Sequence, residues 1–508
     1  MRLPRITAAN EAERRLRRAD FTVVFACFGA ICASWFLLQA SFLSGKPTFP
    51  FATGLYLLGA TLIALRPLVG VYLIAFFGLL ADNVSAPTWP FLKNGSSFES
   101  VMFLHDAVIA SPMEGYLVLT VLATGVHVAL KRVSLSRPPL FYSLTIFVAL
   151  LTVGLFWGVG RGGDVNIALW EFRPFVALYG IYLLGHVLIT SRIQVHLLFW
   201  TIIAAITLES LRASFWVLTD PITELYDSLV EHSGATHISF VLVSMMLAWL
   251  ISEAGFARIA LPLASLPALL VYFESERRSA ILALLIGAIA SMIYLKAENP
   301  VRFYAIGPTL AVVALVYLAV FWNASGPLAF PANAIKSEIA PDAAAAADAA
   351  SDDYRKIEHF NILATIRQSP LLGVGFGQQY LRPIPLPDIS FAFPWWEYIT
   401  HNGLLWIWLK SGYFGFIAMF HFLGQSIVTT MRAAIAVTNP RDKHVAASAM
   451  AFGPMYIVYT YVDISWDTQS LILLALCITI CTKLAAFEAA SAQPESTEPH
   501  VPALIEVP

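Results

Sequence analysis

The chain has 508 residues, of which 58% are hydrophobic and only 13% charged, and its mean hydropathy is +0.71. So much apolar surface excludes an ordinary soluble globule and predicts a polytopic membrane protein. The formal net charge of -2 gives no support for a nucleic-acid partner. We expect an all-α fold, a bundle of about 12 to 14 transmembrane helices with one large periplasmic loop.

The first twenty residues carry six arginines, placed directly before the first apolar run. That run, 21–43, is too long for the apolar core of a signal peptide and lacks a small-residue cleavage site. The sequence therefore predicts a cytoplasmic basic N-terminus over 1–20 and a first membrane span over 21–43.

Apolar runs continue along the chain and divide it into regions. We predict a transmembrane region over 21–322, a large periplasmic loop over 323–411, C-terminal spans over 412–487, and a disordered cytoplasmic tail over 488–508. The candidate spans are 21–43, 49–65, 67–81, 115–130, 140–158, 174–189, 195–218, 236–251, 257–272, 279–295, 301–322, 412–432, 445–462 and 468–487.

The basic residues between these spans follow the positive-inside rule. Counted from a cytoplasmic N-terminus, most of them fall on the cytoplasmic side, which supports both the span count and the orientation. These residues are Arg66, Lys131, Arg132, Arg137, Arg192, Arg258, Lys296, Arg302, Arg432, Arg441 and Lys443.

Four arginines in short outer loops run against this rule, so each needs a local reason. Arg161 and Arg173 lie in one loop, and Arg277 and Arg278 lie in another. One explanation is an ion pair with a neighbouring glutamate, and the other is an anionic ligand. The neighbouring glutamates are Glu171, Glu274 and Glu276.

One predicted span contains charged residues near its outer end. Glu209 and Arg212 are three residues apart and share a helical face. Either they form a self-contained ion pair, or Arg212 is a further donor at an outward-facing anionic site.

The outer loop begins with an alanine-rich spacer over 340–350, which is expected to carry no chemistry. Ser351 is predicted to cap a helix that ends before Pro370, and Arg355 and His359 share one face of that helix. The following GVGFG lacks the features of a phosphate-binding loop and predicts a tight turn or a close backbone approach.

Aromatic residues gather at the end of the loop. Trp395, Trp396 and Tyr398 form either an aromatic belt at the membrane interface or a platform for sugar rings. His401 and Asn402 then open the helix of the next span. We take His401 as the candidate acid–base residue because it lies beside the aromatic residues. No metal-ligating pattern occurs on the predicted outer side, so we expect neither a metal nor a cofactor.

Four motifs occur in a fixed order, mainly over residues 270–420. They are ERRS at 276–279, YR at 354–355, SPLLGVGFG at 369–377 and HNGLLWIWLKSGYFG at 401–415. In these motifs the chain resembles the O-antigen ligase and polymerase family of bacterial inner-membrane glycosyltransferases. The alanine-rich spacer and the extra spans depart from the usual pattern of that family.

The resemblance implies roles for individual residues. Arg278, with Arg277 as its neighbour, and Arg355 match the arginines that bind the substrate diphosphate. Arg173, in EFRPF, is a weaker match to a third such arginine. The loop histidine of the family matches His401, which would act as the catalytic base.

The resemblance also implies the substrates. The donor would be an undecaprenyl-diphosphate-linked glycan, and the acceptor a glycan or a lipid-linked saccharide, in contact with membrane lipids and with polysaccharide assembly and chain-length partners. Arginines would stabilise the leaving diphosphate, and a single displacement would invert the anomeric centre. A transporter or flippase of lipid-linked sugars, or a structural scaffold, are the competing classes.

Overall fold

The computed structural model describes residues 49–80, 91–96, 109–219, 232–251, 254–275, 277–339, 346–390, 395–463 and 466–492. The predicted span 21–43, the basic N-terminus and residues 493–508 of the predicted tail lie outside these ranges. The helices are α2 (Phe49–Leu65), α3 (Leu68–Leu80), α4 (Pro112–Ala129), α5 (Phe141–Gly160), α6 (Val165–Leu188), α7 (Arg192–Thr219), α8 (His232–Leu250), α9 (Ala257–Glu274), α10 (Arg278–Glu298), α11 (Pro300–Phe321), the short 3-10 helix η2 (Pro327–Ala329), α12 (Phe330–Ile339), α13 (Ala346–Gln368), α14 (Gly403–Ala436), α15 (Pro440–Val462) and α16 (Thr468–Ala492).

Every regular element in the described part of the chain is helical, which confirms the predicted all-α fold. Eleven of the described helices are long and apolar enough to cross a membrane, and α2 and α3 are shorter apolar helices. The protein is therefore a multi-pass membrane protein. Most predicted spans coincide with helices, but α6 begins at Val165 and not at 174. Arg173 consequently lies inside a helix and not in a loop, which corrects the prediction.

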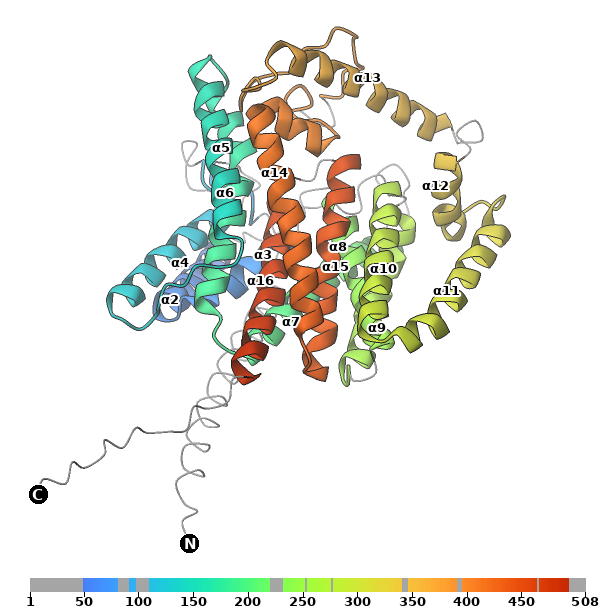
Figure 1. Cartoon of the computed structure of the whole chain (residues 1–508). Helices are drawn as coiled ribbons and strands as arrows, with labels where there is room; N and C mark the ends of the chain where they lie inside the picture. Colours follow the sequence, from blue (N-terminus) through green and yellow to red (C-terminus); the bar gives the residue numbers. More distant parts are fainter. Residues whose placement is uncertain are drawn as a thin grey trace, which may run out of the picture.

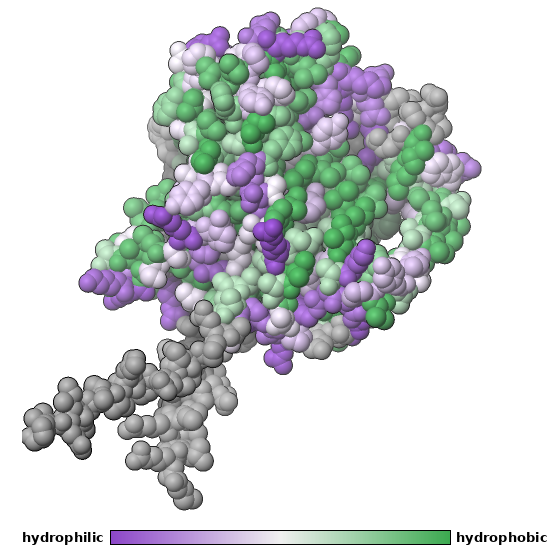
Figure 2. Space-filling view, viewed as in Figure 1, coloured by the Kyte–Doolittle hydropathy of each residue, from purple (hydrophilic) through white to green (hydrophobic). Residues whose placement is uncertain are grey.

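The spanning helices form a bundle, and α13 lies across one end of it (Figure 1). Inside the bundle α6 packs against α16, α10 against α15, and α5 against α14. Helix α11 stands at the edge of the bundle and buries none of its residues. Figure 2 shows mainly hydrophobic side chains on the right half of this face, where α10 and α11 lie, and hydrophilic side chains along the top and lower edges. This distribution suits a bundle that is surrounded by lipid.

Polar caps and prolines begin several of the helices. Ser111 and the side chain of Glu114 form a capping box at the start of α4, with Pro112 in the first turn. Asn299 caps α11 and Asn439 caps α15, each directly before a proline. These signals end one span and begin the next within a few residues, so that neighbouring helices run antiparallel.

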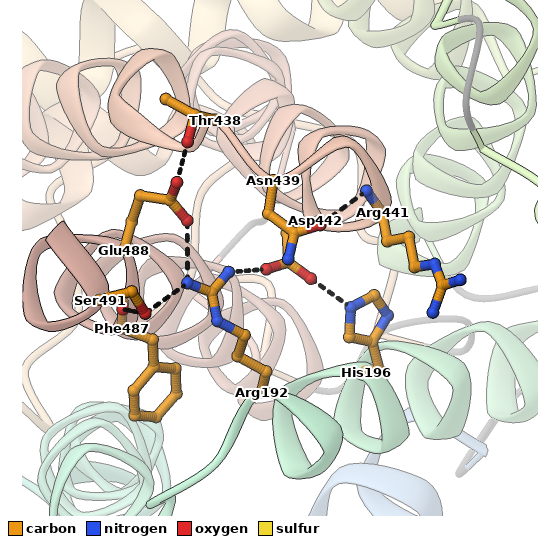
Figure 3. Close-up of polar contacts among 9 residues, drawn as sticks. All are labelled: Arg192, His196, Thr438, Asn439, Arg441, Asp442, Phe487, Glu488 and Ser491. Atoms are coloured by element: carbon orange, nitrogen blue, oxygen red, sulfur yellow. Dashed lines mark hydrogen bonds and ion pairs between the residues drawn. The ribbon is translucent and has the colours of Figure 1, made fainter.

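An ion cluster joins α7, α15 and α16 at the end of the bundle opposite α13 (Figure 3). The guanidinium group of Arg192 pairs with Asp442 and donates to Glu488 Oε2 over 2.9 Å. His196 Nε2 lies 2.6 Å from the other Asp442 oxygen, and Glu488 also accepts a hydrogen bond from Thr438. The cluster therefore connects three helix ends through one arginine.

Helix α13 begins earlier than predicted. It starts at Ala346, so Ser351 lies inside the helix and does not cap it. The alanine-rich stretch explains the extension, because alanine is the best helix former. The end at Gln368, before Pro370, is as predicted.

Candidate active site

A buried glutamate of α13 holds His401, which lies directly before α14. The backbone N–H of His401 donates to Glu358 Oε2 over 2.9 Å, and Nδ1 of the ring lies 3.2 Å from Glu358 Oε1. Glu358 is only 1% exposed. Because a carboxylate can only accept, Nδ1 supplies the hydrogen and Nε2 of the neutral ring keeps its lone pair. His401 is therefore oriented to accept a proton at Nε2.

The charges around His401 strengthen it as a base. Burial by itself would lower the pKa of His401, but its hydrogen bond to Glu358 and the charges of Glu358 and Asp463 raise that pKa above its ordinary value. The positive charge of Arg355 acts in the opposite direction. Tyr354 packs edge-on against the imidazole, with the ring centroids 5.6 Å apart. The ring is thus fixed by packing as well as by hydrogen bonds.

His359, next to Glu358 on α13, has a different role. Its Nε2 lies 2.6 Å from Asn402 Nδ2, and the Asn402 Oδ1 caps α14 by accepting from Leu405 N–H. An amide nitrogen can only donate, so His359 Nε2 accepts. Burial lowers the pKa of His359, which favours the neutral ring that this contact requires. The hydrogen bond between His359 and Asn402 therefore connects α13 to the start of α14.

Arg278 lies at the start of α10 and reaches across to α13. It donates to the two carboxylate oxygens of Asp352 over 2.7 and 3.2 Å. The next residue, Ser279, places its hydroxyl 3.5 Å from Asp463 Oδ2. Asp463 is also the second carboxylate whose charge acts on His401. Arg278 therefore contacts α13, the helix whose Glu358 holds His401, and Asp352 is one carboxylate partner of Arg278.

Arg355 lies one turn beyond Asp352 on α13. Its charge acts on both His359 and His401, which places it in the same group. The Arg355 Nε is buried and has no hydrogen-bond partner among the described residues. Unsatisfied buried donors are uncommon, and an anionic ligand would satisfy this one.

Two of the three remaining arginines that were predicted to bind diphosphate are Arg277 and Arg212. Arg277 is the residue directly before α10. Arg212 and Glu209 pair within α7 at 2.5 Å, and both side chains are 8% exposed. This contact is the ion pair that the sequence offered as one of two alternatives. A role of Arg212 or Arg277 in diphosphate binding stays a prediction.

Arg173 faces a cavity of about 500 Å³ between α4, α6 and the chain before α14 and α16. It donates to Asn94 Oδ1 over 2.7 Å, and its Nε lies 3.4 Å from Glu114 Oε1. The predicted partner Glu171 is instead bound to Lys410. Arg173 therefore reaches a different part of the protein from the Asp352 contact of Arg278, and its predicted role with diphosphate stays untested.

The three predicted aromatic residues have three different surroundings. Trp395 lines the cavity and packs against Trp170, with ring centroids 4.6 Å apart. Trp396 is buried beneath the guanidinium group of Arg382, 4.5 Å from its ring centroid. The hydroxyl of Tyr398 lies 3.2 Å from Gln379 Nε2. Of the three, only Trp395 lines the cavity.

The glycine-rich turn over 373–377 is a close backbone approach, as predicted. Gly375 has φ +94°, and an added Cβ there would lie 2.3 Å from the Cα of Gly158 in α5. A fully buried ion pair holds the end of this turn. Lys410 Nζ lies 2.7 Å from Glu171 Oε1, and Glu171 Oε2 accepts from the Gly377 backbone N–H over 2.7 Å.

Several residues of this site were not found from the sequence. Glu358 lies four residues after Tyr354 and three after Arg355, so its helical face was a usable signal. Asp463 and Lys410 gave no such signal, because their partners lie far away in the sequence. In the described part of the chain, no group of three His, Cys, Asp or Glu residues is suited to hold a metal ion.

Comparison with known proteins supports the sequence resemblance. Residues 263–420 match the family described as O-antigen ligase. The matched segment runs from α9 into α14 and contains Arg278, Arg355 and His401, whereas Arg173 and Arg212 lie outside it. No curated protein matches the chain.

Proposed function

We propose, because residues 263–420 match the family described as O-antigen ligase, that this protein is a glycosyltransferase of the bacterial inner membrane. It would transfer a glycan from undecaprenyl diphosphate to an acceptor hydroxyl at the periplasmic face, as a ligase or a polymerase. The observation that carries the proposal is the His401–Glu358 pair, which lies near Arg355 on α13, the helix that Arg278 also contacts.

The proposed reaction is one displacement. The acceptor oxygen attacks the anomeric carbon, its proton passes to His401 Nε2, and the bond to the diphosphate breaks with its electron pair on the leaving group. Glu358 stabilises the imidazolium that forms. Arg278 and Arg355 stabilise the developing negative charge with permanent cations, so the proposed step uses no metal ion. Attack opposite the leaving group inverts the anomeric centre.

The orientation is a separate part of this proposal. The basic residues between spans support a cytoplasmic N-terminus and a periplasmic α13. Single cysteines at position 8 and at position 346 test it, because an impermeant thiol reagent added to whole cells should label position 346 alone. Labelling at position 8 alone would show that the protein has the opposite orientation.

Reconstitution tests the activity. Purified protein in lipid vesicles would receive undecaprenyl-diphosphate-linked repeat units, and the products would be sized. Long chains from the donor alone indicate a polymerase, and a product that needs a separate acceptor indicates a ligase. Movement of the lipid-linked sugar across the membrane without any new glycosidic bond would indicate a flippase and overturn the proposal.

A further inference from the structure

The cavity beside His401 has the size and the lining of a binding site for a small ligand. Its volume of about 500 Å³ falls within the range of roughly 300 to 1,000 Å³ that is usual for such sites. Four tryptophans and several polar groups line it together. The tryptophans are Trp170, Trp395, Trp406 and Trp466.

One carboxylate oxygen in the cavity has no partner. Asp467 Oδ1 accepts from the Ser470 backbone N–H over 2.8 Å, at the start of α16. Asp467 Oδ2 is buried and has no hydrogen-bond partner among the described residues. A buried acceptor without a donor costs free energy, so a ligand hydroxyl would be stabilising there. In agreement with this, burial raises the pKa of Asp467 to about 6.

The lining is balanced in charge. Glu171 is already paired with Lys410 in the interior. The remaining charged side chains are two cations and two carboxylates, and one of each, Arg173 and Glu114, already pair at 3.4 Å. A site for a strongly anionic ligand would carry an excess of cations. This lining therefore suits a neutral ligand that is rich in hydroxyl groups. The four charged residues are Lys93, Arg173, Glu114 and Asp467.

One short segment, residues 400–403, borders both the cavity and α13. Thr400 and Gly403 line the cavity, whereas His401 and Asn402 contact residues of α13. Arg278, by contrast, is bound to α13 through Asp352. In the proposed reaction His401 takes its proton from the acceptor, and the neighbouring Thr400 lines the cavity. We therefore assign the cavity to the acceptor sugar.

We propose that this cavity binds a neutral sugar residue at the non-reducing end of the acceptor. Asp467 Oδ2 accepts a hydrogen bond from one hydroxyl group of the sugar. The partly exposed rings of Trp170 and Trp395 pack against a face of the sugar ring. The assignment of this sugar to the acceptor rests on the proposed function, whereas the sugar site itself does not.

Direct binding tests the site without any reaction. The protein in nanodiscs would be titrated with methyl glycosides of glucose, galactose and mannose and with glucuronic acid, and binding followed by saturation-transfer NMR. We expect at least one neutral glycoside to bind more tightly than glucuronic acid. Asp467→Asn keeps the cap on α16 but removes the charged acceptor, so it should weaken that binding about tenfold. Asp388→Asn changes an exposed loop carboxylate and should have no effect.

The tryptophan pair needs its own control. Trp170→Ala should weaken the binding of the same glycoside. Trp249→Ala, which removes an exposed tryptophan from α8, should leave that binding unchanged. The site is refuted if none of the neutral glycosides binds, if glucuronic acid binds more tightly, or if Asp467→Asn and Trp170→Ala bind like the wild type.

Transfer kinetics separate this site from the proposed function. If both are right, Asp467→Asn raises KM for the acceptor about tenfold and leaves KM for the donor unchanged. If the protein binds the glycoside but transfers no glycan, the proposed sugar site stands and the proposed function is refuted. If the Asp467→Asn variant transfers normally with an unchanged KM for the acceptor, the proposed glycosyltransferase function stands and the proposed sugar site is refuted.

Discussion

The two ends of the bundle both collect charged residues, yet they satisfy them differently. At the end that holds Arg192, the guanidinium group is shared by Asp442, Glu488 and the hydroxyl of Ser491 (Figure 3). At the α13 end, Arg355 Nε and the Tyr354 hydroxyl are buried without a hydrogen-bond partner among the described residues. The comparison teaches that Arg192 is held by acceptors from two neighbouring helices, whereas Arg355 keeps a buried Nε donor that an anionic ligand would satisfy.

The largest effect should come from His401 itself. His401→Ala should lower the rate of transfer by about 100-fold to 10,000-fold, the usual contribution of a general base, while donor affinity stays normal. His401→Gln should be nearly as slow, because an amide cannot take the proton. Initial rates in vesicles check this, with the exposed His421→Ala on α14 as the control. If glutamine restores most of the rate, His401 only positions the acceptor.

The arginines should matter through the donor. Arg278→Ala and Arg355→Ala should each weaken donor binding and turnover about 10-fold to 100-fold, since a hydrogen bond to a charged group is worth about 1.5 to 3 kcal/mol. Lysine should rescue only in part because it lacks the forked geometry. Arg367→Ala changes an exposed arginine on the same helix and serves as the control. Full activity in both alanine variants would remove the basis of the mechanism.

A smaller effect should appear in the pH profile. The base must be neutral, so kcat/KM should rise with pH as His401 loses its proton, and the raised pKa of His401 moves this rise to higher pH than for an ordinary histidine. Glu358→Gln removes the main group that raises this pKa, so the rise should move to lower pH. Glu397→Gln, in the ion pair with Arg382, is the matched control. An unmoved profile in Glu358→Gln would show that this carboxylate does not tune the base.

At the opposite end, substitution should affect stability and leave the chemistry intact. Arg192→Gln should lower the free energy of unfolding by about 1 to 3 kcal/mol, because two carboxylates lose a charged donor. Thermal melting in nanodiscs measures this, and turnover per folded molecule should be unchanged. Loss of turnover at normal stability would mean that this cluster takes part in the reaction and would break the contrast between the two ends.

Local sequence patterns predicted a large part of this architecture. Apolar run lengths indicated the spanning helices, and the GVGFG turn was predicted as a close backbone approach. Arg355 and His401 were singled out from motifs, and the charge of Arg355 acts on His401, while the roles of both residues stay predictions. These successes depend on signals within a few residues, such as run length, turn glycines and helical spacing.

Contacts between distant helices could not be predicted in the same way. Glu171 is paired with Lys410, and Arg173 with Glu114, although the sequence suggested a pair between the neighbours Glu171 and Arg173. Arg278 also bonds Asp352, which lies 74 residues further along the chain. Helix packing decides which charges meet, and the helical period alone says nothing about the packing of separate helices.

The stereochemistry of the new bond tests the central claim most directly. Wild-type protein would be given a lipid diphosphate donor of defined anomeric configuration, and the product linkage would be assigned by NMR. One displacement assisted by His401 predicts the opposite configuration in the product, with one undecaprenyl diphosphate released for each bond formed. A retained configuration, or a sugar covalently attached to the protein, would contradict the mechanism.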